Sequence, residues 1–230
     1  MDTNALFTHP PTEYNHNLAL FAAWLSEYAY SQQVAWFFPH GEEFNYGFSP
    51  HRNSVAHTIA HTENLIIVVI RGTPEGPEEW ISNFNVGFGE VHTGFLYATN
   101  NVYHTLMNYI AKHNVMSNIM LITGHSRGGA VANLLGARLN RMQENPYVYT
   151  FGAPRVSRTE ATRAHIHSNI FNIINSFDPV IHLPPSVRIN PWRRYGRDFD
   201  IRWLNRNPFH SHELAETYIA WLDNNNPRWH

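Results

Sequence analysis

With 230 residues, 43% of them hydrophobic, the chain is long enough to bury the core of one α/β domain spanning residues 1–230. Its net charge of -2 and lack of long Lys/Arg runs exclude the usual basic surface for nucleic acid or an anionic membrane. No stretch approaches the roughly 18 to 20 apolar residues that span a bilayer, and no targeting signal is visible at the N-terminus. The absence of cysteine excludes disulfides and cysteine-based metal sites.

The first predicted element is an amphipathic helix over residues 14–31, where apolar side chains such as Leu18, Phe21 and Leu25 recur at helical spacing. We expect this helix to pack on a sheet. Residues 34–53 are rich in aromatic residues, proline and glycine, which predicts an irregular connection.

A β-hairpin is predicted next, over residues 54–61 and 65–71, and its second strand is apolar throughout and therefore central. The first strand contains His57 and His61. On a helix this spacing could bind zinc, but four residues of a strand span about 13 Å, too far for one ion. We therefore expect no metal ion here.

Strand and helix patterns alternate through the rest of the chain, which predicts a mostly parallel sheet covered by helices on both faces. Residues 74–84 read as a loop leading to a short amphipathic turn. The other predicted elements are strands at 84–88, 147–151, 169–175 and 198–204, a long helix from Phe95 to about His113, a loop at 184–192 and a closing helix at 211–222.

The pattern around Ser126 predicts a nucleophile elbow. An apolar strand from Ile119 ends at Gly124, and Gly128 begins an Ala/Leu-rich helix. A sharp turn between strand and helix crowds the positions two before and two after the serine, so only glycine-sized residues fit there. This turn would expose the Ser126 hydroxyl and aim the backbone N–H of Arg127 at a developing oxyanion.

A serine nucleophile needs a base and a carboxylate that orients the base. Among the aspartates downstream of Ser126, only Asp178 directly follows an apolar strand with a proline after it, which places it at the carboxyl edge of the sheet. The alternative is an ordinary solvated turn residue. The other candidates are Asp198, Asp200 and Asp223.

The base is expected between the last strand and the closing helix, where His210 and His212 both lie. We favour His212, although the pair could instead bind a metal or form a surface patch. His182 is only four residues from Asp178, and His230 is terminal. Thr73 follows the central strand and can offer its backbone N–H and its hydroxyl to an oxyanion.

Several motifs together resemble the class 3 lipases, the fungal triacylglycerol lipase type, in the right order over about residues 65–220. The motifs are Arg71-Gly72-Thr73, Trp80-Ile81 with Phe84, Val91-His92-Thr93-Gly94-Phe95, Gly124-His125-Ser126-Arg127-Gly128-Gly129, Tyr149-Thr150-Phe151-Gly152-Ala153-Pro154-Arg155-Val156, Asn175, Asp178-Pro179-Val180 and Leu183-Pro184.

The resemblance implies an α/β-hydrolase fold, hydrolysis of acylglycerol esters through an acyl-enzyme, no cofactor, and transient contact with a lipid interface. It implies that Ser126 is the nucleophile, Asp178 the orienting acid and His212 the base. Thr73 and the Arg127 backbone would form the oxyanion hole. The residue after the nucleophile is usually leucine in this family. A lid would correspond to residues 74–84.

Four other functions are considered at this point. A phospholipase A1 or a short-chain esterase would use the same three residues, a non-catalytic lipid-binding protein could share the scaffold, and a histidine-based metallohydrolase would need a His-Glu-x-x-His spacing that the sequence lacks. Acyl-chain preference, compartment, oligomeric state and interfacial activation are not determined by the sequence.

Overall fold

The fold is built on a seven-stranded sheet in the strand order β1-β2-β3-β4-β5-β6-β7. The computed structural model describes residues 3–38, 40–44, 55–73, 89–115, 119–159, 162, 165–188, 191–205, 207 and 210–225. The strands are β1 (His40–Phe44), β2 (His57–His61), β3 (Leu65–Ile70), β4 (Ile119–His125), β5 (Tyr147–Phe151), β6 (Ile170–Ile174) and β7 (Arg197–Asp200). Strands β1 to β3 pair antiparallel, and β3 to β7 pair parallel.

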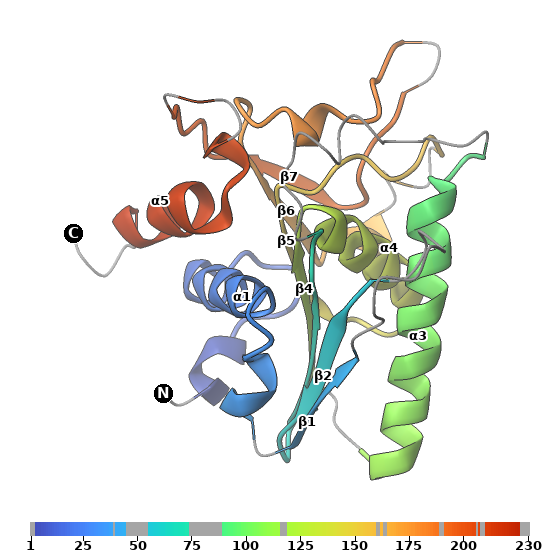
Figure 1. Cartoon of the computed structure of the whole chain (residues 1–230). Helices are drawn as coiled ribbons and strands as arrows, with labels where there is room; N and C mark the ends of the chain where they lie inside the picture. The colour runs from blue at the N-terminus through green and yellow to red at the C-terminus, as the bar shows by residue number, and fades with distance from the viewer. Residues whose placement is uncertain are drawn as a thin grey trace.

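Helices cover both faces of this sheet (Figure 1). One face carries α1 (His16–Tyr28) and the C-terminal helices, namely the π-helix η7 (Leu214–Ile219) and α5 (Ala220–Asn224). The other face carries α3 (Thr93–His113) and α4 (Arg127–Arg141). Short 3₁₀ helices are η1 (Thr3–Phe7), η2 (Val34–Phe37), η4 (His165–His167), η5 (Val180–His182) and η6 (His210–His212). The predicted mostly parallel, doubly covered sheet is confirmed.

Strand β3 shows why its sequence is apolar without interruption. Leu65, Ile67 and Val69 belong to the core cluster under α1, whereas the intervening Ile66, Val68 and Ile70 belong to the cluster under α3 and α4. Successive side chains of a strand point to opposite faces, so a strand buried on both faces needs an apolar residue at every position.

The predicted helix at 14–31 is confirmed, with narrower bounds. It begins at His16 because the Asn15 side chain accepts a hydrogen bond from the backbone N–H of Leu18 (3.1 Å), which caps the first turn. The long helix, the hairpin and the strands at 147–151 and 169–175 are also confirmed. The predicted strand at 84–88 and the lid-like segment at 74–84 lie outside the described residues.

Three predictions about local structure are wrong in part. Residues 34–53 contain η2 and the edge strand β1. The residues of β1 are mostly polar and half-exposed, so they lack the apolar alternation that predicts a strand. The closing segment 211–222 is not one α-helix, because it is divided into η6, η7 and α5. The last strand, β7, ends at Asp200 and not at residue 204.

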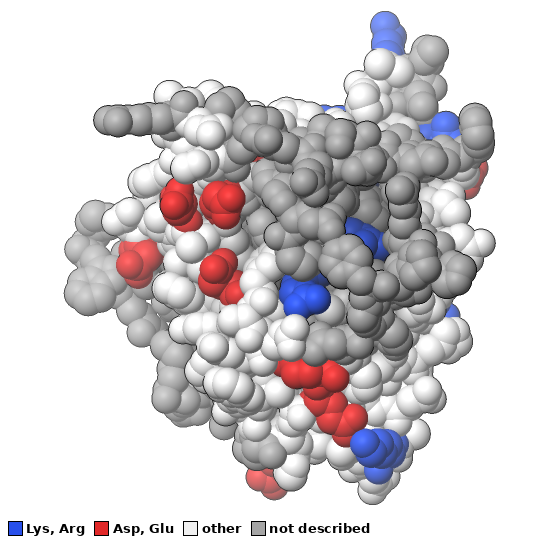
Figure 2. Space-filling view, in the orientation of Figure 1, with Lys and Arg blue, Asp and Glu red and all other residues white. Residues whose placement is uncertain are grey.

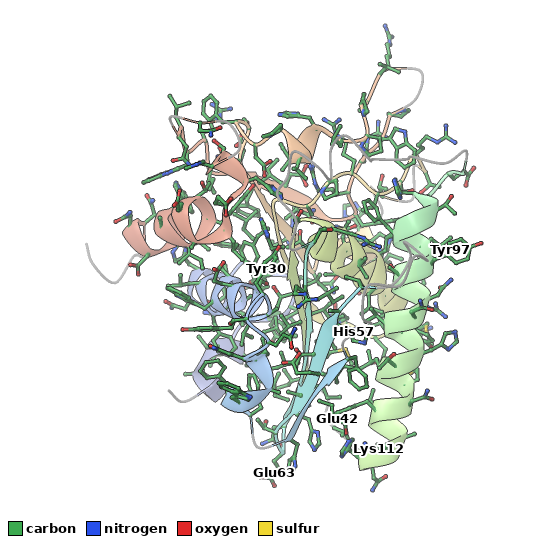
Figure 3. All side chains as sticks on the ribbon, in the orientation of Figure 1. Tyr30, Glu42, His57, Glu63, Tyr97 and Lys112 are labelled. Carbon is green, nitrogen blue, oxygen red and sulfur yellow. The ribbon has the colours of Figure 1, made fainter. Side chains whose placement is uncertain are left out.

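The two histidines of the first hairpin strand lie on β2, four strand positions apart. His57 is 2% exposed on the side of the sheet that α3 covers (Figure 3), and its Nδ1 contacts the backbone oxygen of Val55 (3.0 Å). Within the described ranges no group of three or more potential ligands is arranged to hold a metal ion. None of the helices described is long and apolar enough to cross a membrane.

The stability of the fold is expected to fall as the pH drops from about 6.5 to about 4. Burial lowers the pKa of His57 from 6.5 to about 4. Between these values the unfolded chain binds a proton that the folded chain does not, so acidification favours unfolding. Protonation of His57 in the unfolded chain therefore lowers the free energy of unfolding by about 3 kcal/mol between pH 7 and pH 4.

Urea denaturation at pH 7, 5.5 and 4 measures this dependence on pH. The dependence should be weaker in His57→Gln and unchanged in His104→Gln, a substitution at an exposed site. An unaltered slope in His57→Gln would contradict the assignment.

Candidate active site

Ser126 occupies a strained turn between β4 and α4. Its backbone has φ 56° and ψ −127°, a region that residues with a side chain rarely adopt. The backbone N–H of Ser126 donates to the oxygen of Phe151 on β5 (2.9 Å), which holds the turn against the sheet. The predicted elbow is therefore present as a backbone conformation.

The glycines on either side of Ser126 are required by close backbone packing. A Cβ atom added at Gly124 would lie 2.7 Å from the carbonyl group of Gly128 and 2.7 Å from the oxygen of Ile70. A Cβ atom at Gly128 would lie 2.1 Å from the same Ile70 oxygen. These contacts involve backbone atoms, which cannot move aside, so the start of α4 reaches its place only if both residues are glycine.

Asp178 and His212 meet at the carboxyl edge of the sheet although 34 residues separate them. The His212 Nδ1 and the Asp178 Oδ2 are 2.7 Å apart, and the two side chains are 6% and 0% exposed. The Asp178 Oδ1 accepts a hydrogen bond from the backbone N–H of Val180 (2.8 Å). The carboxylate accepts from Nδ1–H and so orients the imidazole with Nε2 as its remaining nitrogen.

Tyr218 on η7 is a further partner of the buried carboxylate. Its hydroxyl donates to the Asp178 Oδ2 (2.7 Å). Burial, and then the negative charge of Asp178, raise the pKa of Tyr218 well above its usual value, so the phenol remains a donor. Gly152, at φ +54°, leaves the space for this cluster, because a Cβ atom there would lie 3.0 Å from both the Asp178 Oδ2 and the Tyr218 hydroxyl.

His125, the neighbour of Ser126, packs against His212. The two ring centroids are 4.6 Å apart, tilted by 34°. The His125 Nε2 lies 2.8 Å from the backbone oxygen of His212, and its Nδ1 lies 2.8 Å from the hydroxyl of Tyr30, which Figure 3 shows near the end of α1. Since a carbonyl only accepts, Nε2 carries the proton and Nδ1 accepts from Tyr30. Burial, and then His212, lower the pKa of His125 well below its usual value, which keeps this ring neutral.

Thr73 and Arg127 each lie at or near the end of a secondary-structure element. Thr73 follows β3, and its Oγ1 is buried without a hydrogen-bond partner in the described part of the chain. Arg127 is the first residue of α4, where backbone N–H groups have no acceptor within the helix. The Arg127 side chain is half-buried, and burial lowers its pKa.

The other candidates from the sequence are occupied elsewhere. His210 is largely exposed, and its Nδ1 lies 3.1 Å from Glu216. The His182 Nε2 lies 3.0 Å from the backbone oxygen of Ser176.

The alternative acids also have other partners. Asp198 pairs with Arg194 (2.9 Å), and Asp200 accepts a hydrogen bond from Ser176. Of the acidic and histidine candidates with described positions, only Asp178 and His212 contact one another.

The comparisons with known proteins identify the family. The model of the family described as Lipase (class 3) matches residues 67–188, and the chain belongs to this family. A secreted mono- and diacylglycerol lipase from Fusarium solani is 34% identical over 53% of this chain and 40% of its own length. A lipase from Rhizomucor miehei is 30% identical over 55% of this chain and 39% of its own length. The match thus spans about two fifths of these curated relatives.

Solved structures show the α/β-hydrolase fold. The triacylglyceride lipase of Rhizomucor miehei superimposes with a TM-score of 0.63 at 22% identity, covering 81% of this chain and 80% of that one. The LIP2 lipase of Yarrowia lipolytica superimposes with a TM-score of 0.61 at 20% identity, covering 88% and 81%. The expected family and fold are confirmed.

The sequence did not indicate the roles of Tyr30, His125 and Tyr218 in this cluster. Tyr30 is 95 residues from its partner His125, and Tyr218 is 40 residues from Asp178. No local spacing signals such contacts. The sequence indicates only that His125 directly precedes Ser126 and therefore lies near the site.

The contact between Tyr218 and Asp178 gives a testable expectation for ester hydrolysis. Tyr218→Phe keeps the ring but removes a hydrogen bond to a charged group, worth about 1.5–3 kcal/mol. We expect kcat on p-nitrophenyl butyrate to fall about tenfold or more with KM unchanged, because the imidazole is held less firmly.

Tyr109→Phe is the matched control for this substitution, since it removes another buried hydroxyl, one that contacts His61 (2.8 Å) on β2. It should leave kcat unaltered. A Tyr218→Phe protein with the kcat of the wild type would contradict the role assigned to this hydroxyl.

Proposed function

We propose that the protein is a serine ester hydrolase that cleaves acylglycerols, with Ser126 as nucleophile, His212 as general base and Asp178 as the orienting acid. The observation that carries this proposal is the buried contact of 2.7 Å between His212 and Asp178, placed beside the strained turn that contains Ser126. Membership of the class 3 lipase family supports the same reaction.

The reaction follows from what each group can donate or accept. The Ser126 hydroxyl oxygen attacks the ester carbonyl while the Nε2 of His212 takes its proton. When the tetrahedral intermediate collapses, the same imidazole returns the proton to the leaving alcohol and an acyl-serine remains. Water then attacks the acyl group with His212 again as base, releasing the fatty acid and restoring the serine. Asp178 holds the imidazole and stabilises its charged form throughout.

The oxyanion of the tetrahedral intermediate requires donors opposite the serine. We assign this role to Thr73 and to the backbone N–H of Arg127. The buried, unpartnered Oγ1 of Thr73 among the described residues supports this, because a hydroxyl in that state has a donor available for a substrate oxygen. Replacement of the usual leucine by Arg127 leaves the backbone donor in place.

Acylglycerols are the proposed substrates because the matched relatives include a mono- and diacylglycerol lipase from Fusarium solani. A phospholipase A1 or a short-chain esterase would use the same chemistry. Relative rates on butyrate and palmitate esters and on phosphatidylcholine distinguish an acylglycerol lipase, a short-chain esterase and a phospholipase A1.

The proposal includes transient contact with a lipid interface and a lid at residues 74–84. It treats residues 1–230 as one domain, which is supported by core clusters that join elements from Leu6 to Leu222.

Replacement of the proposed nucleophile tests the function directly. Ser126→Ala removes the attacking oxygen, and we expect kcat/KM on p-nitrophenyl butyrate to fall about a thousandfold or more. Thermal unfolding should remain close to that of the wild type, since alanine adds no atom to the turn. Ser31→Ala, at an exposed serine near the end of α1, is the control and should retain full activity. Wild-type activity in Ser126→Ala would overturn the proposal, because hydrolysis would then not depend on this serine. Absence of ester hydrolysis in the wild type would instead favour a non-catalytic lipid-binding protein.

A further inference from the structure

A cavity of about 570 Å³ lies beside the candidate active site. Its lining comes from Arg155 after β5, from residues after β6 that include Ile181 and Ser186, and from the segment before and at the start of β7, where Trp192, Arg193, Arg194, Gly196 and Asp198 line it. None of Ser126, His212 and Thr73 lines it. The cavity is therefore a separate space, although it shares a wall with the segment that follows Asp178.

Positive charge dominates the described lining of this cavity. Three arginines, Arg155, Arg193 and Arg194, line it together with one carboxylate, that of Asp198. The Arg194 side chain is only 4% exposed, whereas Asp198 is 42% exposed. On another side of the molecule, where Figure 1 places α1 and α5, carboxylates gather instead (Figure 2).

Backbone carbonyls hold two of the arginines in fixed positions. Arg155 donates from Nη1 to the oxygens of His182 (2.6 Å) and Pro184 (2.9 Å). Arg194 donates to the oxygens of Ala153 (2.6 Å) and Ile181, and to Asp198 (2.9 Å). A guanidinium has five N–H donors. Within the described part of the chain, half of the ten donors on Arg155 and Arg194 have no acceptor.

The arrangement leaves positive charge that the protein neutralises only in part. Burial, and then the neighbouring Arg194, lower the pKa of Arg155, while Asp198 opposes this shift. Buried charges of one sign are costly unless a counter-charge is present. Planar guanidinium groups with free parallel N–H donors match the oxygens of phosphate and carboxylate. An anion of that shape would satisfy both the charge and the donors.

We propose that this cavity is a binding site for a small oxyanion of the phosphate class, with Arg155 and Arg194 as its principal ligands. The anion is either free phosphate or the phosphodiester of a lipid headgroup. Its ligands also hold the carbonyls of Ile181 and His182, three and four residues after Asp178, so the site adjoins the segment that positions the orienting acid.

Isothermal titration of the protein with inorganic phosphate at low ionic strength tests the proposal. Ser186 lines the cavity and is exposed, so Ser186→Glu adds a negative charge without disturbing the core, and Ser186→Gln is the neutral control of the same size. We expect phosphate binding to weaken about tenfold or more in Ser186→Glu and to stay within about twofold of wild type in Ser186→Gln. Asp198→Asn removes the opposing carboxylate and should tighten binding severalfold.

Two results would overturn the proposal. One is the absence of heat from phosphate binding to the wild type at millimolar concentrations. The other is equal affinity of Ser186→Glu and Ser186→Gln. Titration with glycerophosphocholine distinguishes the two sources, since tighter binding of this phosphodiester indicates a headgroup and tighter binding of inorganic phosphate indicates a free anion. The measurement involves no ester hydrolysis, so it is independent of the proposed function of Ser126.

Discussion

The structure depends on one close approach, that between the beginning of α4 and the end of β3. At Gly128 the backbone comes so near to the oxygen of Ile70 that a Cβ atom would lie 2.1 Å from it. This approach accompanies the positive φ of Ser126, which lies between β4 and α4 at the carboxyl edge of the sheet. The Ser126 residue is 7% exposed, so the elbow does not expose its hydroxyl as fully as the sequence predicts. The same edge receives the ends of β3 and β6, and with them Thr73 and Asp178.

A second layer of polar side chains holds the groups around this edge. Tyr218 donates to Asp178, and His125 contacts the backbone oxygen of His212 while Tyr30 contacts His125. Asp178, His212, His125 and Tyr218 are buried and Tyr30 is half-buried, and each has its partner from a different element of the fold. These hydrogen bonds are formed within the protein, which leaves the imidazole oriented before any substrate binds.

Local chemistry explains which features could be predicted from the sequence. The elbow glycines and the apolar run of β3 reflect steric and burial requirements that act over a few residues, and Asp178 was found because it follows an apolar strand. Edge strand β1 is not predictable in this way, because half-exposed polar residues such as Glu42 and Glu43 are equally typical of a loop. The preference for His212 over His210, and the contacts of Tyr218, depend on long-range packing that no local pattern records.

The proposed chemistry requires that His212 activate Ser126 as a nucleophile. Labelling with a fluorophosphonate, followed by mass spectrometry of the proteolytic peptides, tests this requirement, because the reagent bonds covalently to an activated serine. We expect one label per chain, located on Ser126, and its loss in His212→Ala. A chain that takes up no label, or that is labelled on another serine, would show that Ser126 is not the activated nucleophile.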